Sequence, residues 1–373
     1  MNTFRLGDVL EVQSGFAFKK EYFSESDGVP LIRIRDLDNF STEINYLGEY
    51  RNEFIVETGA YLIGMDGSFQ CHRWRGGRAL LNQRVSRLRN FKEVVEPEYV
   101  YYGIQKKLTE IENTTSFVTV KHISAKQIQN IELPLPTIAE QRRIVDILSR
   151  AEGIVRLRRD AEKKAAELIP ALFFDMFGDP ATNPKSLPTK KINDICDLVR
   201  GSSPRPQGDS RFFGGPVPRL MIADVTRDGV YVIPRIDSLT IEGAKKSRPM
   251  KAGEVVMAVS GAVGLPAILA IDACIHDGFV GFRSLSGEVS PEYFYNFLAA
   301  YRHLSVGQAV GATFQNLKTD QIREWLVPLP SQTEQAHFNR VAADIRSLEI
   351  QQSAATAKAQ AAFDALLAQV FQG

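Results

Sequence analysis

The stretch LPLPTIAEQ at residues 133–141 recurs as VPLPSQTEQ at residues 327–335, an offset of 194 residues. In each copy, prolines hold the chain extended ahead of a hydroxyl residue, which is followed three residues later by glutamate: Thr137 with Glu140, and Ser331 with Glu334. This spacing predicts a capping box, in which each of the two side chains accepts a hydrogen bond from the other residue's backbone amide. We therefore expect a helix to begin at each site.

A helical pattern extends from these starts to Phe177 and to Phe371. Small and apolar side chains recur alternately four and three residues apart, and a polar residue interrupts both copies at the same position, at Arg158 and Gln352. The pattern predicts a coiled-coil seam between two helices of roughly 60 Å each. The predicted seam comprises Ile147, Ala151, Ile154, Ala161, Ala165, Leu168 and Leu172 in the first helix, and Val341, Ile345, Leu348, Ala355, Ala359, Ala362 and Leu366 in the second.

Two unrelated surface helices, each packed on its own domain, are the alternative to a paired seam. The matched length, caps and register favour the pair. Pro170 lies within the first helix where the second copy has Asp364, which predicts a kink in one helix only.

Composition limits the class of protein. A chain of 373 residues with 44% apolar residues is sufficient for two or three domains. The net charge of +1 means that any nucleic-acid-binding surface must be local. No apolar run of ~18 residues and no signal peptide is present, so we expect no membrane segment. The cysteines, Cys71, Cys196 and Cys274, lack paired spacing, which fits a reducing cytoplasm and argues against structural zinc.

The repeat extends beyond the helices. The tripeptide PEY at residues 97–99 recurs at 291–293, and LGDV at 6–9 resembles INDI at 192–195 with the smaller offset of 186. The second copy therefore contains a longer early loop, around residues 204–215. The predicted order is a first globular domain at 1–136, a first helix at 137–178, a linker at 179–188, a second globular domain at 189–330 and a second helix at 331–373.

The predicted fold class is α+β. Short β-branched runs such as 29–34 and 254–259 predict strands, whereas 98–111 and 292–304 predict helices. We expect two tandem globular α/β domains with pseudo-two-fold symmetry, separated by two long antiparallel coiled-coil helices. The copies diverge most in loop regions, which indicates either two surfaces with different targets or neutral drift of loops.

Basic and amide side chains cluster within these divergent regions. Arginine offers forked donors to phosphates and guanine, and Asn or Gln can pair with adenine. For any single arginine, a solvated face paired with nearby acids is the better explanation, but the clusters favour nucleic acid. The candidate DNA-binding residues are Arg33, Arg35, Ser68, Arg73, Arg75, Arg78, Asn82, Gln83, Arg84, Lys121 and His122 in the first domain, and Arg200, Ser202, Arg205, Arg211, Lys245, Lys246, Arg248, Ser260, His276, Gln315 and Asn316 in the second.

Motifs of catalysis are missing from the sequence. There is no phosphate-binding loop of the Gly-x-x-x-x-Gly-Lys-Ser/Thr type, no His-Glu-x-x-His and no Gly-x-Ser-x-Gly. The Asn/Asp-Pro-Pro-Tyr/Phe tetrapeptide of amino-methyltransferases is also missing. We therefore expect no catalytic residue and no metal site in this chain.

The two Leu/Val-Pro-Leu-Pro-x-x-x-Glu-Gln junctions, each opening a long helix, and the stretch GATFQNL at 311–317 resemble the specificity (S) subunit of type I restriction-modification systems. The resemblance covers essentially the whole chain, although the first domain lacks a glycine equivalent to Gly311. It implies two target-recognition domains, each recognising one half of a split site on double-stranded DNA, and a helix pair that sets the spacer between the half-sites.

The same resemblance implies the partners. Two methyltransferase subunits are expected to dock on the helices and the adjoining domain faces, and motor-nuclease subunits join for restriction. S-adenosylmethionine, ATP and magnesium belong to those partners, so no cofactor is expected in this chain.

Two other functions stay open at this point. A protein–protein scaffold with two divergent binding domains would show no DNA sequence preference when methyltransferase is present. A stand-alone enzyme would methylate or cut DNA by itself, and the missing motifs argue against this possibility.

Overall fold

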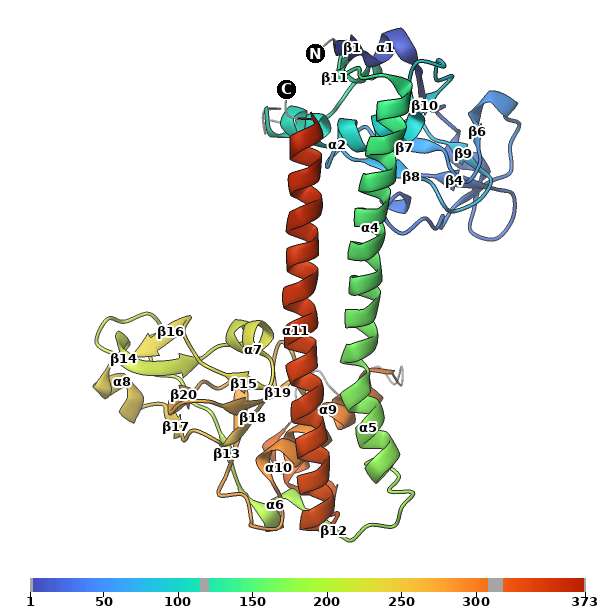
Figure 1. Ribbon diagram of the computed structural model, residues 1–373. Helices are drawn as coiled ribbons and strands as arrows, with labels where there is room; N and C mark the ends of the chain where they lie inside the picture. Colours follow the sequence, from blue (N-terminus) through green and yellow to red (C-terminus); the bar gives the residue numbers. More distant parts are fainter. Residues whose placement is uncertain (1–2, 115–120, 308–317, 372–373) are drawn as a thin grey trace. The chain divides into compact units, whose positions relative to one another are not determined.

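The computed structural model describes residues 3–114, 121–307 and 318–371 (Figure 1). The chain forms two compact units, Met1–Arg159 with Ala354–Gly373, and Asp160–Ser353. We call them unit 1 and unit 2. Each contains a mixed α/β domain together with a part of each long helix, which confirms the predicted α+β class. Within the described ranges, no helix combines the length and apolar character that a membrane span requires.

Unit 1 consists of short strands and helices. Its strands are β1 (Thr3–Arg5), β2 (Glu11–Ser14), β3 (Phe23–Ser24), β4 (Val29–Ile32), β5 (Asn45–Tyr46), β6 (Ile55–Val56), β7 (Tyr61–Gly64), β8 (Cys71–Arg73), β9 (Ala79–Leu81), β10 (Val85–Arg89) and β11 (Glu132–Pro134). Its helices are α1 (Leu6–Val9), η1 (Lys20–Tyr22), η2 (Ile34–Asp36), η3 (Asn52–Phe54), α2 (Pro97–Thr114), α3 (Ala125–Gln129) and α4 (Ile138–Ala166), which continues into unit 2.

The sheets of unit 1 have the strand orders β2-β10-β7-β8 and β3-β5-β4-β9-β6, and β1 pairs with β11. Helix α2 packs against the first of these sheets. Its apolar residues Val100, Ile104 and Leu108 recur at a spacing of four, so they share one helix face, and all are fully buried. This layer of helix on sheet is the main core of unit 1.

Unit 2 repeats the plan. Its strands are β12 (Thr189–Lys191), β13 (Asp197–Arg200), β14 (Phe213–Leu220), β15 (Tyr231–Val232), β16 (Asp237–Leu239), β17 (Arg248–Met250), β18 (Val255–Ala258), β19 (Pro266–Leu269), β20 (Ala273–Ile275), β21 (Phe279–Arg283) and β22 (Leu326–Pro328). Its helices are α5 (Leu168–Phe177), α6 (Ile192–Ile195), α7 (Ile222–Asp228), α8 (Ile241–Lys245), α9 (Pro291–Gly307), α10 (Thr319–Arg323) and α11 (Gln332–Phe371), which continues into unit 1.

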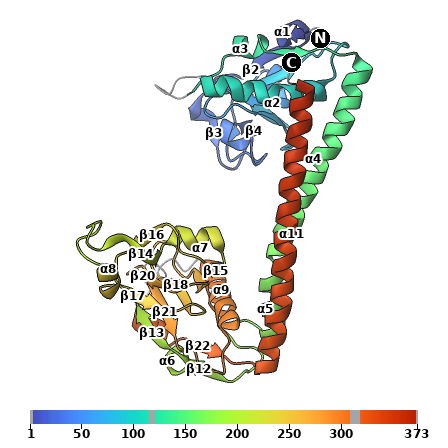
Figure 2. The same cartoon turned by 60° about the vertical axis from the view of Figure 1, so that its left-hand side comes forward.

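The sheets of unit 2 have the orders β13-β21-β18-β19-β15 and β16-β14-β20-β17, and β12 pairs with β22. The parallel pair β14–β20 corresponds to the parallel pair β4–β9 of unit 1, and the antiparallel pair β13–β21 corresponds to β2–β10. Helix α9 lies along its sheet as α2 does, and it buries Phe294 and Phe297 (Figure 2). The internal repeat of the sequence is therefore a repeat of the fold.

The glutamine that closes the repeated stretch is buried in both copies. In unit 1, the side chain of Gln141 is fully buried, and its carbonyl oxygen accepts a hydrogen bond from the backbone amide of Glu96 at 2.8 Å. Its amide nitrogen donates to the carbonyl oxygens of Val94 and Pro136, both at 3.0 Å. One side chain thus ties the start of α4 to the loop that precedes α2.

Gln335 makes the same contacts in unit 2. Its carbonyl oxygen accepts from the backbone amide of Ser290 at 2.9 Å. Its amide nitrogen donates to the carbonyl oxygens of Glu288 at 2.8 Å and of Pro330 at 3.0 Å. We call the contacts of Gln141 and Gln335 the glutamine clamps.

The predicted N-terminal caps lie at the expected residues. In the second helix both bonds of the box are present, because the amide of Glu334 donates to the hydroxyl of Ser331 at 3.3 Å and the amide of Ser331 donates to the Glu334 carboxylate at 2.8 Å. In the first helix, the amide of Glu140 donates to the hydroxyl of Thr137 at 3.3 Å, and the Glu140 carboxylate pairs with Arg143.

The predicted kink near Pro170 is confirmed. Helix α4 ends at Ala166 and α5 begins at Leu168, whereas α11 is continuous over 40 residues. Proline has no amide hydrogen to donate to the carbonyl of Ala166, and its ring crowds that carbonyl, so the helix is interrupted one turn before Pro170.

The long helices pack on each other within unit 1. Leu148, near the start of α4, lies in one buried cluster with Phe363 and Phe371, near the end of α11. Tyr99 of α2 belongs to the same cluster, and its ring lies 5.0 Å from that of Phe371. Figures 1 and 2 both show the last turns of α11 beside the first half of α4.

Unit 2 contains the complementary contact. Phe173 and Phe177, at the end of the first helix, pack against Phe338 and Ala342, near the start of α11. The ring centroids of Phe177 and Phe338 are 5.4 Å apart. In both units the beginning of one helix meets the end of the other, so the pair is antiparallel, and the alternative of two unrelated helices is wrong.

The predicted seam is wrong at every second position, where the more buried residue is the one that follows the predicted residue. Apolar side chains predicted to lie in it are exposed: Ile147 (41%), Ile154 (51%), Leu168 (51%) and Leu348 (57%). The alanines Ala161 and Ala362 are exposed as well, and Val341 and Ala355 are only half-buried. The residue after each is more buried in the described helices, for example Leu148, Val155, Ile169, Ala342 and Thr356.

The remaining predicted positions are half-buried, as a seam requires: Ala151, Ala165, Leu172, Ile345, Ala359 and Leu366. Two seams with alternating spacings of four and three can share every second position and differ at the rest. The observed seam buries the ring of Phe338 and half-buries that of Phe363, which directly follows the predicted position Ala362.

Candidate nucleic-acid interface

In unit 1, a short turn between β9 and β10 is tied to two other segments. This first turn comprises residues 82–84, Asn82-Gln83-Arg84. The backbone amide of Gln83 donates to the carbonyl of Phe16 at 2.9 Å, and the amide of Met65 donates to the carbonyl of Arg84 at 2.9 Å. Backbone hydrogen bonds therefore fix the conformation of the turn independently of its exposed side chains.

In unit 2, the equivalent second turn comprises residues 276–278, His276-Asp277-Gly278, between β20 and β21. The amide of Val259 donates to the carbonyl of Gly278 at 2.8 Å, as Met65 does in the first turn. The amide of Phe279 closes the turn by donating to the carbonyl of His276 at 2.9 Å. The two domains thus present the same backbone turn with different side chains.

A glycine lies against each turn because a side chain does not fit there. A Cβ atom on Gly15 would lie 2.0 Å from the carbonyl oxygen of Asn82, and one on Gly201 would lie 2.0 Å from that of His276. Real Cβ atoms do not approach an oxygen so closely. The contact between glycine and turn is therefore a common feature of both domains.

The first turn presents a guanidinium group held by a carboxylate. Arg84, whose side chain is 58% exposed, pairs with Asp66 at 2.5 Å. Asp66 is only 16% exposed and also contacts Nδ1 of His122 at 2.7 Å, and the His122 ring is itself half exposed. Gln83 is exposed beside them. Asp66 therefore holds one cation and one imidazole at the surface.

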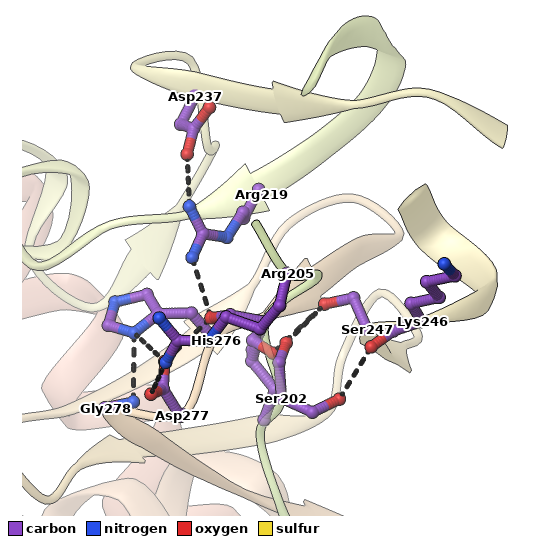
Figure 3. Close-up of polar contacts among 11 residues, drawn as sticks. Ser202, Arg205, Arg219, Asp237, Lys246, Ser247, His276, Asp277 and Gly278 are labelled. Atoms are coloured by element: carbon purple, nitrogen blue, oxygen red, sulfur yellow. Dashed lines mark hydrogen bonds and ion pairs between the residues drawn. The ribbon is translucent and has the colours of Figure 1, made fainter. Parts of the chain in front are cut away.

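The second turn presents a carboxylate. Asp277, 56% exposed, accepts a hydrogen bond from the hydroxyl of Ser203 at 2.7 Å and lies 3.5 Å from the guanidinium of Arg205 (Figure 3). Behind them, the buried guanidinium of Arg219 donates to the Ser203 hydroxyl at 2.9 Å and pairs with Asp237 at 2.5 Å. This chain of contacts fixes Asp277 from its inner side and leaves its outer side open to solvent.

Basic side chains lie beside the second turn. The hydroxyl of Ser202 donates to the carbonyl of Lys246 at 3.2 Å, and that of Ser247 donates to the carbonyl of Ser202 at 2.8 Å (Figure 3). The ammonium of Lys246 lies 4.0 Å from the ring centre of Phe212, and Arg211 stacks on the same ring at 5.2 Å. The aromatic ring supports both cations at the surface.

The charge states of the second turn follow from these contacts. The hydrogen bond from Ser203 is the main reason why the pKa of Asp277 lies below its ordinary value, so this carboxylate is ionised at neutral pH. Burial lowers the pKa of His276, and the nearby Arg219 lowers it further, so the imidazole is neutral. The turn therefore offers a fixed negative charge next to an uncharged ring.

Arg73 of unit 1 is half-buried among carboxylates and an aromatic ring. It forms an ion pair with Glu98, lies 3.8 Å from Glu152 and stacks on the ring of Tyr101 at 4.5 Å. Burial alone would lower its pKa, but the neighbouring carboxylates, Glu98 foremost, outweigh that effect and raise it. These contacts favour a structural role in joining β8 to α2 and α4.

The other candidates of the first domain are exposed or paired with acids. Arg33 precedes η2 and Arg35 lies within it, and both pair with the carboxylate of Glu43. Ser68, Arg75 and Arg78 are exposed. Arg75 lies over the ring of Phe40, and Arg78 lies 4.0 Å from Glu57. Lys121 lies 3.7 Å from Glu112.

In the second domain, Arg248 donates to the carbonyl of Arg200 at 3.0 Å, and Ser260 lies against Gly278 of the turn. Lys245 is exposed at the end of α8, and Arg211 pairs with Asp209 at 2.6 Å. Gln315 and Asn316 lie outside the described residues.

The sequence patterns did not indicate some functional candidates, which are either acidic residues or residues that support them from behind. Asp66 and Asp277 orient or replace basic groups at the turns, and Ser203 and Arg219 support Asp277 from below. A search for basic clusters does not select carboxylates. The signal that could have found them is the alignment of the two copies, which sets Asn82-Gln83-Arg84 opposite His276-Asp277-Gly278. Among the described residues, no group of three His, Cys, Asp or Glu side chains is placed to hold a metal ion.

Comparisons with known proteins agree on one class. Residues 1–167 match the family model of the type I restriction modification DNA specificity domain. The specificity subunit of the EcoBI type I restriction enzyme of Escherichia coli is 26% identical over 414 residues, which cover 99% of this chain and 85% of that protein. The MjaIX specificity subunit of Methanocaldococcus jannaschii is 28% identical over 159 residues, 41% of this chain and 36% of that one.

Solved structures show the same fold. A chain from a study of complex assembly and conformational transition of the type I R-M system superposes with a TM-score of 0.64 at 19% identity, covering 99% of this chain and 97% of that chain. The type I restriction-modification S subunit from M. genitalium gives 0.56 at 13% identity, covering 99% and 96%.

The fold and the comparisons agree in their likeness to DNA-specificity proteins of restriction-modification systems. Over nearly its whole length the chain is similar to the specificity (S) subunit of a type I restriction enzyme, and residues 1–167 match the DNA specificity domain of these systems. A specificity subunit is a non-catalytic component of these enzymes.

Proposed function

We propose that this chain recognises a bipartite DNA site, with one domain on each half-site and the helix pair setting the spacer between them. The observation that carries the proposal is the pair of equivalent turns, which share the backbone hydrogen bond that closes the turn and the one that anchors its last residue, and which carry different side chains. Two domains with one fold but unlike recognition chemistry suit a DNA site whose halves differ in sequence. The exposed members of the candidate DNA-binding residues would then contact bases or phosphates.

The length of the helices supports a spacer role. A helix of 40 residues is about 60 Å long at the usual rise, which exceeds the separation of roughly 34 Å between half-sites one helical turn apart. The antiparallel contacts at both ends of the pair would keep this length constant. On this proposal residues 1–136 and 189–330 are the recognition domains, 137–178 and 331–373 are the spacer helices, and 179–188 is the linker.

We further propose that two methyltransferase subunits dock on the long helices and adjoining domain faces, and that motor-nuclease subunits join them. Large apolar side chains exposed on these helices support the proposal: Ile154 (51%), Leu157 (65%), Leu348 (57%) and Ile350 (71%). S-adenosylmethionine, ATP and magnesium would be bound by those partners. The complex would work in the cytoplasm, where it meets cellular DNA.

The test is methylome sequencing of a host that carries this chain with its methyltransferase, compared with a host that lacks the chain. We expect one bipartite methylated motif that disappears with the chain. A methylation pattern that is the same in both hosts would contradict DNA recognition. Together with a mobility-shift assay that finds no sequence preference, it would favour the alternative of a protein–protein scaffold.

A further inference from the structure

The side chains on the two equivalent turns have opposite hydrogen-bonding character. The first turn presents Arg84, which only donates, and the second presents Asp277, which as a carboxylate only accepts. The backbone that carries them is the same, because each turn is closed and anchored by corresponding hydrogen bonds and lies against a glycine. The difference between the domains at this place is therefore a difference in what the turn can recognise.

We infer that the first turn (residues 82–84) and the second turn (residues 276–278) are the base-recognition elements of the two domains, with Arg84 and Asp277 contacting base edges. The inference rests on the proposed DNA recognition and deepens it. It assigns one specificity-determining residue to each half-site, and it makes Asp66 and Ser203 positioning residues.

In the first turn, the arrangement suits a base edge that presents hydrogen-bond acceptors. Asp66 binds one side of the Arg84 guanidinium at 2.5 Å, which orients the planar group and leaves its other donors facing solvent. A forked pair of donors matches the O6 and N7 acceptors of guanine in the major groove. Gln83 is exposed next to it and can contact a neighbouring base.

In the second turn, the arrangement suits a base edge that presents an amino group as a hydrogen-bond donor. An exposed carboxylate is repelled by phosphate, so Asp277 would disfavour binding if it faced the DNA backbone. It can accept from the amino group of cytosine or adenine, which are the donors that base edges present in the major groove. Lys246, which lies on the ring of Phe212 beside the turn, supplies positive charge that brings the backbone close.

The alternative for Arg84 is a phosphate contact. Its pairing with Asp66 argues against this role, because the carboxylate cancels most of the charge that a phosphate would attract while it keeps the donors in a fixed plane. His122, held by the same carboxylate at 2.7 Å, completes a rigid group at the surface rather than a mobile cation.

The experiment uses the full chain in complex with its methyltransferase. Methylome sequencing is performed for the wild type, Arg84→Ala and Asp277→Asn, and for the controls Arg5→Ala and Asp320→Asn, which change an exposed residue of the same type elsewhere in each domain. We expect Arg84→Ala to relax one base position in one half-site and Asp277→Asn to alter one position in the other half-site. The spacer and the opposite half-site should be unchanged, as should both controls.

Competition binding with duplexes that carry each base at every half-site position gives the second measurement. The preference at the affected position should fall roughly ten- to a hundredfold in each variant. Asp66→Asn should weaken discrimination at the same base position as Arg84→Ala, which a merely structural role would not produce.

Unchanged motifs in both variants would overturn the inference, as would a uniform loss of affinity on all sequences, which marks a phosphate contact. These outcomes differ from failure of the proposed function itself. In that case the wild-type complex would produce no bipartite motif at all.

Discussion

At the scale of single residues, the glutamine clamps show how one side chain can join two elements of a domain. Each glutamine satisfies backbone groups from the loop before α2 or α9 and from the proline that precedes the N-cap residue of the long helix. The contact with Pro330 is buried and the others are partly buried, where a backbone group without a partner is costly. The clamp therefore orients the long helix relative to the domain from which it emerges.

The clamp leads to a prediction for Gln335→Leu. The substitution leaves the amide of Ser290 and the carbonyls of Glu288 and Pro330 without this partner, and we expect a loss of about 3 kcal/mol in the free energy of unfolding. Urea denaturation of the full chain measures it. Gln351→Leu, the same change at an exposed position of the same helix, should be nearly neutral, and equal effects of the two changes would show that the clamp contributes nothing.

Arg73 gives a second prediction at this scale. Arg73→Ala should destabilise unit 1 by about 2 kcal/mol, because Glu98 loses its ion-pair partner at a half-buried site. The dependence of DNA affinity on salt should not change, since no phosphate contact is lost. The measurements are urea denaturation and binding of the methyltransferase complex at several salt concentrations. A salt dependence that becomes weaker would restore Arg73 to the DNA surface.

The difference between Arg73 and Arg84 shows where sequence reasoning ends at this scale. Both belong to one arginine-rich stretch, and composition favours nucleic acid for the group as a whole. Which arginine meets a carboxylate in the interior depends on contacts between segments far apart in the chain, such as β8 with α2. For the same reason the spacing in LPLPTIAEQ predicts the caps but does not indicate the partners of Gln141.

At the scale of elements, the long helices could be predicted in extent but not in rotation. Their starts follow from the local chemistry of the caps, and the interruption follows from Pro170. Which helix face forms the seam depends on which side chains the domains cover. Tyr99 and Tyr293 of the domains pack against the aromatic side chains of the long helices. A sequence rich in alanine at the competing positions carries little information about that choice.

Gly153 provides a prediction for α4. It lies within the helix, and a Cβ atom added to it would meet nothing within 4 Å. Gly153→Ala should therefore stabilise the protein by about 0.5–1 kcal/mol, because alanine loses less conformational entropy on folding. Thermal unfolding of the full chain provides the measurement.

The control for Gly153 is the same substitution at Gly59. That glycine also has open space around it, but its φ angle is +95°. Gly59→Ala should destabilise the protein, because alanine resists a positive φ. If both substitutions shifted the unfolding temperature in the same direction, backbone conformation would not be the cause.

At the scale of the whole molecule, the duplication separates two tasks. The parts that agree between the copies are the sheet order, the clamps and the aromatic contacts of the long helices. The parts that differ include the side chains on the turns and the outermost strands of the sheets. The repeat could be predicted from the constant offset of 194 residues, which also sets Asn82 opposite His276, whereas the contact of each turn with a glycine became evident only from the structure.

If the helix pair sets the spacer, its length should determine the distance between the half-sites. Seven residues added to each helix, after Arg159 and after Ser353, keep the seam in register and lengthen the pair by about 10 Å. At about 3.4 Å per base pair, the recognised spacer should widen by about three base pairs, with both half-sites unchanged. Methylome sequencing measures the spacer directly. Insertion into one helix alone puts the two helices out of register and should abolish methylation. If the matched pair of insertions left the spacer at its original width, the helices would not determine the spacer length.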